Sequence, residues 1–347
     1  MRSASTNVNQ ANSPSLETEI KIAIRPFRPM SIFRNPHIQT IVGAYLRSTT
    51  GVSFERVRIS TPDNDFIALD FPDVEGALLE ENAPIVLLLH GMGGSARQGY
   101  ACEVYRQLAQ AGIRCVGMNY RSCGGEANLQ PKTYHAGATE DVETVIRWLR
   151  EQHPHVPLGI IGVSLGANIL VKFLGEAKRD VTVGAAISCP FDLLAGSKAL
   201  EKGISRFYGQ SVLSGLKESI QRKTHQIAHI VDIEKVMAAR TLYEYDAVCT
   251  APLHEFPDVR TYYDRCSAKQ FVASIQTPTL IIRALDDPFL DPQDVPYKIL
   301  EKNKWIQAEL TSHGGHVGFT EGGLPWRLQW WAHQEIARFM RKHLVTF

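Results

Sequence analysis

One stretch of this chain limits its possible folds more than any other, the run PLGIIGVSLGANILVKFL at residues 157–174. At its centre, the pentapeptide Gly-Val-Ser-Leu-Gly (162–166) fits the pattern G-x-S-x-G. An apolar, β-prone run precedes it and a helix-prone run follows it, which is the context that a nucleophile elbow requires. The glycines allow two backbone segments to approach closely. We expect Ser164 to project above a sheet, near the positive end of the next helix. The alternative is a serine that merely caps a helix in another α/β fold.

Strand and helix patterns alternate along most of the chain. Apolar, β-prone runs occur at 54–60, 66–71, 84–89, 113–118, 158–163, 181–189, 279–285 and 306–312. Helical patterns separate most of these runs, and a final helical pattern begins at about Pro325. This alternation predicts an α/β protein with a mostly parallel, eight-stranded sheet flanked by helices.

The alternation stops between about residues 194 and 275, where helical patterns and clustered tyrosines replace the strand patterns. We interpret this segment as a helical cap inserted after the sixth strand. The expected division is a disordered N-terminus (1–20), a core (21–193) that begins with an arm at 21–49, the cap (194–275) and the rest of the core (276–347).

Composition excludes several classes of protein. The 347 residues carry 37 basic and 36 acidic side chains, and this balance provides no general attraction to nucleic acid or to an anionic membrane. The N-terminus has no apolar secretory segment, and no apolar run reaches the ~18–20 residues of a membrane span. The six cysteines form no C-x-x-C pair and are expected to be reduced thiols. We therefore expect a cytoplasmic protein without a transmembrane segment. The sequence does not indicate an oligomeric state.

The sequence also predicts that no cofactor or metal takes part. No G-x-G-x-x-G or P-loop motif follows a predicted strand, which argues against a nucleotide. His225 and His229 have the spacing of metal ligands on a helix, but the glutamate of an H-E-x-x-H motif is missing.

Candidate partners of Ser164 stand just after two later strands. A serine hydroxyl needs an adjacent base to become a nucleophile, and the base needs an orienting group. In sheets of this type, the loops at the carboxyl ends of the strands form the site. Asp287 follows the strand at 279–285, and His316 follows the strand at 306–312. The chain order Ser, Asp, His is that of an α/β-hydrolase, so the sequence predicts this fold with Ser164, Asp287 and His316 as its catalytic residues.

Alternatives to two of these residues remain open. Asp286 precedes Asp287 at the same strand end, and Asp192 follows the preceding strand. We favour Asp287 because it begins a turn that leads away from the strand, whereas Asp286 can cap that turn. His313 is the alternative to His316, which we favour because the glycines before it allow its loop to fold back over the serine.

Two backbone amides are expected to stabilise the oxyanion of an acyl-transfer reaction. One belongs to Leu165, the residue after the nucleophile, and the other to Met92, in the loop after the strand at 84–89. Glycines on both sides of Met92 allow close approach of the backbone. His90, at the start of the same loop, is expected to make structural hydrogen bonds rather than to catalyse.

The chain resembles the YheT-type (also called Emb-type) α/β-hydrolases, which are related to the abhydrolase-domain lipid esterases of eukaryotes. The matching stretches occur in family order: PHIQT at 36–40, HGMGGS at 90–95, NYRSCGG at 119–125, GVSLGAN at 162–168, YYDRCS at 262–267, ALDDPF at 284–289 and HGGHVGF at 313–319. Two positions depart from the family pattern, which usually has glycine where Ser122 and Ala167 stand. These departures concern loop detail or substrate shape rather than chemistry.

The resemblance implies a carboxylic ester hydrolase in which Ser164 is the nucleophile, Asp287 the acid and His316 the base. Family substrates are short- to medium-chain esters and acylglycerol-like lipids, so a small-molecule or lipid ester is the expected partner. The reaction would proceed through an acyl-enzyme intermediate. Two alternatives are an acyltransferase that uses the same three residues and a non-catalytic, ligand-binding protein built on the hydrolase fold.

Overall fold

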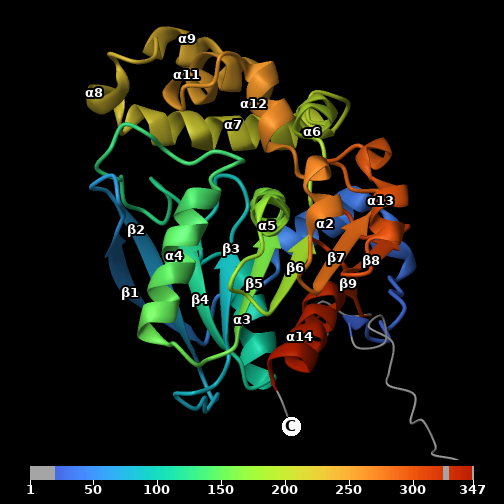
Figure 1. Ribbon diagram of the computed structural model, residues 1–347. Coiled ribbons are helices and arrows are strands. Elements are labelled where there is room, and N and C mark those ends of the chain that lie inside the picture. The colour runs from blue at the N-terminus through green and yellow to red at the C-terminus, as the bar shows by residue number, and fades with distance from the viewer. Residues whose placement is uncertain (1–19, 323–327, 346–347) are drawn as a thin grey trace, which may run out of the picture.

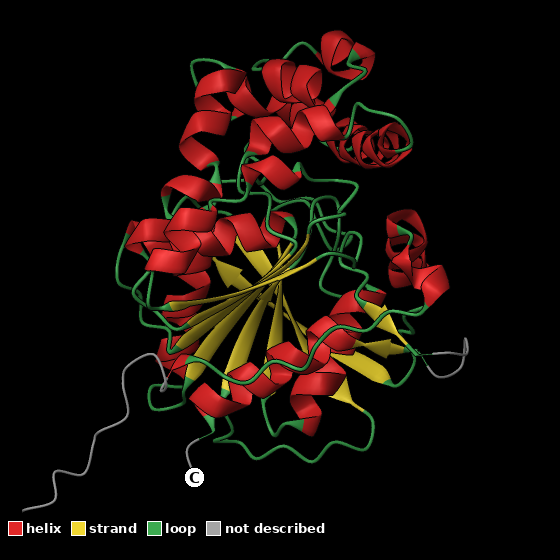
Figure 2. Ribbon diagram, turned by 90° about the vertical axis from the view of Figure 1, so that its right-hand side faces the viewer, coloured by secondary structure: helices red, strands yellow, loops and turns green. Residues whose placement is uncertain are grey.

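The computed structural model describes residues 20–322 and 328–345 (Figure 1). The predicted disorder of residues 1–20 therefore concerns a segment that, except for Ile20, lies outside the described residues. Helices lie on both faces of a twisted central sheet, and a further group of helices lies over one end of its strands (Figures 1 and 2).

The main sheet has eight strands in the order β1-β2-β4-β3-β5-β6-β7-β8. β1 pairs antiparallel with β2, and β2 with β4, whereas the other neighbours pair in parallel. This arrangement confirms the predicted mostly parallel sheet. The strands are β1 (Val52–Ser60), β2 (Phe66–Val74), β3 (Ile85–Leu89), β4 (Arg114–Asn119), β5 (Leu158–Val163), β6 (Val183–Ile187), β7 (Thr279–Ala284) and β8 (Ile306–Thr311).

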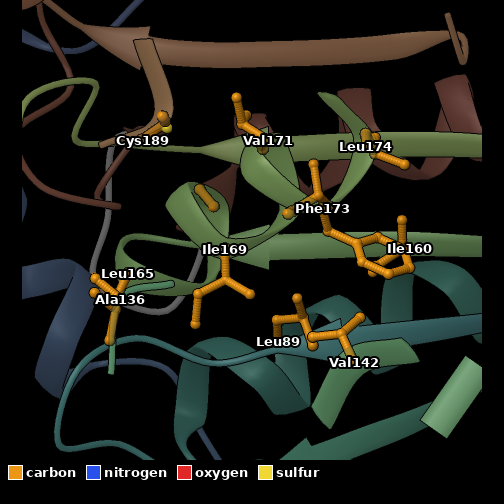
Figure 3. Packing of buried hydrophobic residues seen from close by; sticks show 14 of the residues in the cluster. Leu89, Ala136, Val142, Ile160, Leu165, Ile169, Val171, Phe173, Leu174 and Cys189 are labelled. Atoms are coloured by element: carbon orange, nitrogen blue, oxygen red, sulfur yellow. The ribbon is translucent and has the colours of Figure 1, made fainter. Parts of the chain in front are cut away.

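Two apolar layers cover the faces of the sheet. β3 is buried along its whole length, with Leu87 in one layer and Val86 in the other. α4 and α5 belong to the first layer, where Figure 3 shows Phe173 of α5 close to Ile160 of β5, and α3 and α14 belong to the second. A parallel sheet needs cover on both faces, which is why its strands read as unbroken apolar runs. The core helices are α3 (Gly99–Gln110), α4 (Thr139–Gln152), α5 (Leu165–Glu176), α13 (Tyr297–Lys302) and α14 (Trp331–Leu344), with the 3-10 turn η5 (Pro292–Asp294) before α13.

Between β6 and β7 the chain forms a cap of helices and turns over the carboxyl ends of the parallel strands (Figure 1). A separate apolar cluster that includes Leu213, Ile220 and Val236 gives the cap a small core of its own. The helical cap after the sixth strand is as predicted, and its boundaries at 194 and 275 stay a prediction. Its elements are α6 (Leu193–Ala199), α7 (Ser205–Gln221), α8 (Thr224–Ile227), α9 (Ile233–Ala238), α10 (Leu242–Tyr245), the π-helical turn η2 (Asp246–Thr250), α11 (Ala251–Leu253), α12 (Val259–Cys266) and the 3-10 turns η3 (Ala268–Gln270) and η4 (Val272–Ser274).

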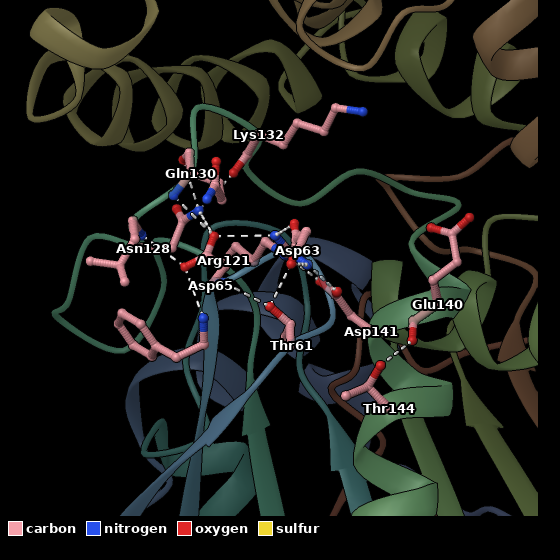
Figure 4. Close-up of polar contacts among 12 residues, drawn as sticks. Thr61, Asp63, Asp65, Arg121, Asn128, Gln130, Lys132, Glu140, Asp141 and Thr144 are labelled. Carbon is pink, nitrogen blue, oxygen red and sulfur yellow. Dashed lines mark hydrogen bonds and ion pairs between the residues drawn. The ribbon is translucent and has the colours of Figure 1, made fainter.

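A buried polar network fastens the cap to the loop after β4. Lys223, between α7 and α8, is fully buried, and its Nζ donates to Oδ1 of Asn128 at 2.6 Å and to the carbonyl of Gln130 at 2.5 Å. Burial lowers the pKa of Lys223 to about 8. Asn128 donates in turn to Asp65 at 2.6 Å, and Arg121 pairs with the same carboxylate at 3.1 Å (Figure 4). Because removing one partner of a buried ionic network leaves a charge uncompensated, this network holds the cap in one place.

An N-terminal arm leads to a short helix. Its first part runs beside α14, where Nε1 of Trp331 donates to the carbonyl of Arg25 at 2.7 Å. Arg25 also pairs with Glu321 at 2.5 Å. The turn η1 (Ser31–Arg34) and the helix α2 (Pro36–Tyr45) follow. The N-terminal arm is thus held against Glu321 and α14, which lie near the end of the described chain.

The predicted start of the last helix was wrong. α14 begins at Trp331, because Gln329–Trp330 forms the strand β10, which pairs antiparallel with β9 (Thr320–Glu321). Pro325, where the helix was expected to begin, lies outside the described residues. Strands of two residues carry no periodicity, so no sequence pattern predicted this pair.

The turn between β5 and α5 brings three backbone segments together. A Cβ atom on Gly162 would lie 2.2 Å from the carbonyl oxygen of Gly166, and a Cβ atom on Gly166 would lie 2.2 Å from the carbonyl oxygen of Leu89 in β3. A Cβ atom cannot lie so close to a backbone oxygen, so only glycine fits at these two positions. The loops that follow β3 and β5 therefore meet at this turn.

We expect Gly166→Ala to lower the free energy of unfolding by about 1–3 kcal/mol, the usual cost of forcing extra volume into a packed interior. The matched control is Gly215→Ala in α7, where no atom lies within 4 Å of the added Cβ. In a helix this second change is neutral or stabilises by up to about 1 kcal/mol. Urea unfolding of both variants measures the difference, and equal stabilities would contradict the close contact.

Candidate active site

Ser164 occupies a strained backbone conformation between β5 and α5. Its φ is 55° and its ψ is −117°, a combination that residues other than glycine rarely adopt. Its amide donates to the carbonyl of Ile187 at 2.9 Å, which fixes the turn to the end of β6. Strain of this kind persists only where the surroundings enforce it, and it is typical of a nucleophile elbow.

The structure brings Ser164, His316 and Asp287 into one hydrogen-bonded chain. Nε2 of His316 lies 2.9 Å from Oγ of Ser164, and Nδ1 lies 2.9 Å and 3.1 Å from the two carboxylate oxygens of Asp287. The Asp287 side chain is only 1% exposed and that of His316 10%. A carboxylate beside Nδ1 keeps the ring proton there, and Nε2 is then free to accept the serine proton.

A second aspartate–histidine pair lies beside this chain. Nδ1 of His313 is 3.3 Å from Oδ2 of Asp286, and Oδ1 of Asp286 accepts a hydrogen bond from the amide of Gly315 at 3.0 Å. Burial raises the pKa of Asp286. The two alternatives left open by the sequence thus pair with each other, and Asp286 supports the loop that carries His316.

The other candidates lie in different surroundings. Asp192 caps the N-terminus of α6 and forms an ion pair with Lys269. His225 and His229 do not share a helix, because α8 ends between them, so the spacing argument for a metal does not apply to them. Among the described residues, no group of three or more histidine, cysteine, aspartate or glutamate side chains is placed to hold a metal ion.

Aromatic rings connect His316 to the cap and to α2. Phe289 stacks on His316 with the ring centres 4.0 Å apart and the planes 2° from parallel. Tyr208 of α7 also stacks on Phe289, with the two ring centres 5.0 Å apart. The hydroxyl of Tyr208 lies 3.1 Å from Nδ1 of His37 in α2. Sequence reasoning missed this stack, since nothing in the pattern around Phe289 indicates what its ring contacts.

The two expected oxyanion donors, Met92 and Leu165, border the cavity next to Ser164. The loop after β3 passes close to the serine, since a Cβ atom on Gly91 would lie 3.4 Å from Cβ of Ser164. Leu165 is the first residue of α5, where a helix leaves its amides without internal partners. His90 is buried, with Nδ1 2.7 Å from the carbonyl of Gly91, and burial lowers its pKa to about 4, so it is a neutral residue with a structural hydrogen bond.

The helix α2 holds the loop that carries His316. Oγ1 of Thr40 accepts a hydrogen bond from the amide of His316 at 2.9 Å. The Gln39 side chain exchanges two hydrogen bonds with the backbone of Thr320, at 2.7 Å and 3.1 Å. These contacts join residues 276 and 281 positions apart, which is why sequence reasoning missed them.

Arg47, just after α2, also binds the loop that carries His316. One Nη atom donates to the carbonyls of Val317 and Gly318 at 2.6 Å and 2.8 Å. Burial lowers the pKa of Arg47 to about 9. Val317 has a φ of 60°, which a branched side chain adopts only where its surroundings enforce it, and these hydrogen bonds help to maintain that conformation.

Ser164 and His316 open into a cavity of about 450 Å³ beneath the cap. Its wall contains many apolar side chains, among them Leu193, Leu200, Val212, Leu242, Phe289 and Leu290. A cavity of this size with a few polar groups at one end is typical of a small-molecule site.

Two further observations concern the whole described chain. All six cysteines belong to the described residues and are free thiols. Among residues 20–322 and 328–345, none of the helices combines the length and the apolar character needed to cross a membrane.

The sheet, the strained serine after β5 and the cap over the strand ends define an α/β-hydrolase. Residues 80–321 match the family model Hydrolase_4, described as "Serine aminopeptidase, S33". The chain belongs to this family.

The chain is also similar to proteins that are named as esterases and lipases. It is 35% identical to a protein of Escherichia coli (strain K12) named "Putative esterase YheT", over 92% of this chain and 94% of that protein. It is 30% identical to human phospholipase ABHD3 over 83% of this chain and 72% of that protein. It is 26% identical to a monoacylglycerol lipase of Saccharomyces cerevisiae over 78% of this chain and 62% of that protein. These similarities confirm the resemblance deduced from the motifs and identify an α/β-hydrolase of the esterase and lipase type.

Solved structures share the fold. An esterase of Pyrococcus furiosus, Pf2001, aligns with a TM-score of 0.54 and 17% identity, over 84% of this chain and 93% of that chain. A 2,6-dihydroxy-pseudo-oxynicotine hydrolase aligns with a TM-score of 0.57 and 15% identity, over 84% of this chain and 68% of that chain. At these identities the likeness concerns the fold alone.

We expect Thr40→Val to lower kcat for ester hydrolysis about fivefold or more with little change in KM, because the His316 amide loses its buried acceptor. Thr40→Ser keeps the acceptor and should retain the wild-type kcat. Steady-state kinetics, with the melting temperature of each variant as a control for folding, measures this. A valine variant with wild-type kcat would contradict a positioning role for Thr40.

Proposed function

We propose that this protein is a serine carboxylic-ester hydrolase in which Ser164 attacks the ester carbonyl, His316 is the base and Asp287 orients His316. One observation carries the proposal: hydrogen bonds of 2.9 Å link Oγ of Ser164 to His316 and His316 to Asp287. This is the distance at which a side chain can take a proton from a nucleophile and pass it on.

The expected reaction has two halves. Oγ of Ser164 bonds to the carbonyl carbon while its proton moves to Nε2 of His316, which then gives that proton to the leaving alcohol. The acyl-enzyme that remains is attacked by water, whose proton again moves to His316. His316 then gives this proton to Oγ of Ser164 as the bond between Oγ and the acyl carbon breaks and the carboxylic acid leaves. The carboxylate of Asp287 stabilises the imidazolium in each half without taking its proton.

Backbone amides would stabilise the negative oxygen of each tetrahedral intermediate. Met92 and Leu165 border the cavity beside Ser164, and the N-terminus of α5 adds its positive end. In comparable enzymes, one such donor contributes about 3 kcal/mol to the stability of the transition state. Both donors are part of the backbone, so they need no particular side chain.

The expected substrates are short- to medium-chain or acylglycerol-like esters. The apolar cap side chains beside Ser164 suit an acyl chain, and a cavity of about 450 Å³ suits one of limited length. The names of two relatives, a phospholipase and a monoacylglycerol lipase, support an ester of a lipid. Free thiols at all six cysteines suit the cytoplasm, where we expect the protein to act.

Hydrolysis of a p-nitrophenyl ester series by the wild type and Ser164→Ala tests the proposal. We expect the serine variant to lose about 10³-fold or more in kcat, because the nucleophile is gone. His316→Asn should lose a similar factor. The matched control His313→Asn changes a residue of the neighbouring pair and should stay within about threefold of the wild type.

Several results would contradict parts of the proposal. Wild-type rates in Ser164→Ala would exclude this serine as the nucleophile. Equal losses in His313→Asn and His316→Asn would make the assignment of the base wrong. Highest activity on the longest acyl chains would contradict a substrate limited by the cavity. Diversion of the acyl group to added glycerol in place of water would favour the acyltransferase.

A further inference from the structure

The cap contributes one carboxylate to the cavity that contains Ser164. Asp246 is the first residue of the π-helical turn η2, and it lines both the main cavity and a neighbouring pocket of about 40 Å³. π-helical turns are rare and occur frequently at functional sites. The proposed hydrolysis uses no polar group of the cap, so it leaves Asp246 without a role.

Two neutral donors hold this carboxylate in place. Oγ1 of Thr250 donates to Oδ1 at 2.5 Å, and the hydroxyl of Tyr263 donates to Oδ2 at 2.7 Å. Burial raises the pKa of Asp246 to about 6, and among the described residues no cation beside it lowers that value. A carboxylate has about four acceptor positions, so each oxygen keeps room for one more donor.

The surroundings of Asp246 indicate what that donor is. The cavity wall nearby is largely apolar and includes Leu242, Val212 and the ring of Tyr262. A ligand that fits this wall has an apolar part and one hydrogen-bond donor. A hydrogen bond to a charged acceptor is stronger than one between neutral groups, so the cavity favours a ligand that donates to an open acceptor position of Asp246. Thr250 and Tyr263 both donate from hydroxyls, and a ligand hydroxyl is a donor of the same kind.

We propose that Asp246 forms a subsite that accepts a hydrogen bond from a free hydroxyl group of the substrate, and that it thereby selects the alcohol part among acylglycerol-like esters. The proposal rests on ester hydrolysis at Ser164, because both residues line one cavity. A simple alkyl ester offers no donor to the acceptor positions that Thr250 and Tyr263 leave open, and it is therefore bound less well. Selectivity for the alcohol part then comes from Asp246, while the apolar wall binds the acyl chain.

The test compares glycerol 1-monobutyrate with propyl butyrate, which carries the same acyl group but no hydroxyl. Asp246→Asn keeps both cap contacts, since a hydroxyl can accept from the amide NH₂ as well as donate to its oxygen. The substrate hydroxyl then meets a neutral amide in place of a carboxylate, and its hydrogen bond is weaker. We therefore expect this variant to lose about tenfold in kcat/KM on the glycerol ester, mainly through KM, and about twofold or less on propyl butyrate. The matched control Asp264→Asn changes an exposed residue of α12 and should leave both esters unaffected.

Two outcomes would overturn the proposal. Equal losses on both esters would make Asp246 a structural residue that only ties η2 to Tyr263. A larger loss on butyrylcholine than on the glycerol ester would assign Asp246 to positively charged groups instead.

If the wild type hydrolyses none of these esters, the proposed function fails, and binding then tests the subsite on its own. The probe is 1-O-butylglycerol, an ether that cannot be hydrolysed, titrated calorimetrically into Ser164→Ala and into Ser164→Ala/Asp246→Asn. About tenfold weaker binding by the double variant would support the subsite. Equal binding by the two variants would overturn it.

Discussion

The direct contact between α2 and the loop of His316 is the constraint on which the site depends most. Gly315, at a φ of 57°, has no room for a side chain, because a Cβ atom there would lie 2.5 Å from the carbonyl of Pro36. Thr40 binds the amide of His316 at 2.9 Å from the same helix. The turn between β5 and α5 fixes the position of Ser164, and α2 fixes the position of His316. The 2.9 Å separation between Oγ and Nε2 follows from both.

The cap adds the third part of the site. Lys223 ties it to the loop after β4, and the stack of Tyr208 on Phe289 continues to His316. The cap is therefore bound to the core by polar contacts at one end and by stacked rings at the other. The cavity between them is apolar apart from a few groups such as Asp246, which is why the choice of substrate is expected to depend on the cap rather than on the strand ends.

Much of this arrangement could be predicted from the sequence, because strand ends in a parallel sheet have a fixed place. The apolar run of β5 followed by Gly162 and Ser164 predicted the elbow, and the positions of Asp287 and His316 after β7 and β8 predicted that they would meet. Contacts that carry no local pattern could not be predicted. The hydrogen bond from His316 to Thr40 joins residues 276 positions apart, and Ser122 takes the left-handed conformation (φ 64°) that favours glycine.

The central claim is that Ser164 is a nucleophile activated by His316. Mass spectrometry of peptides from protein treated with a fluorophosphonate tests it most directly, because the reagent bonds only to a serine that an adjacent base has activated. We expect one adduct, on the peptide that contains Ser164, and labelling about 10²-fold slower or more in His316→Asn. An adduct on another residue, or labelling of His316→Asn at the wild-type rate, would contradict it.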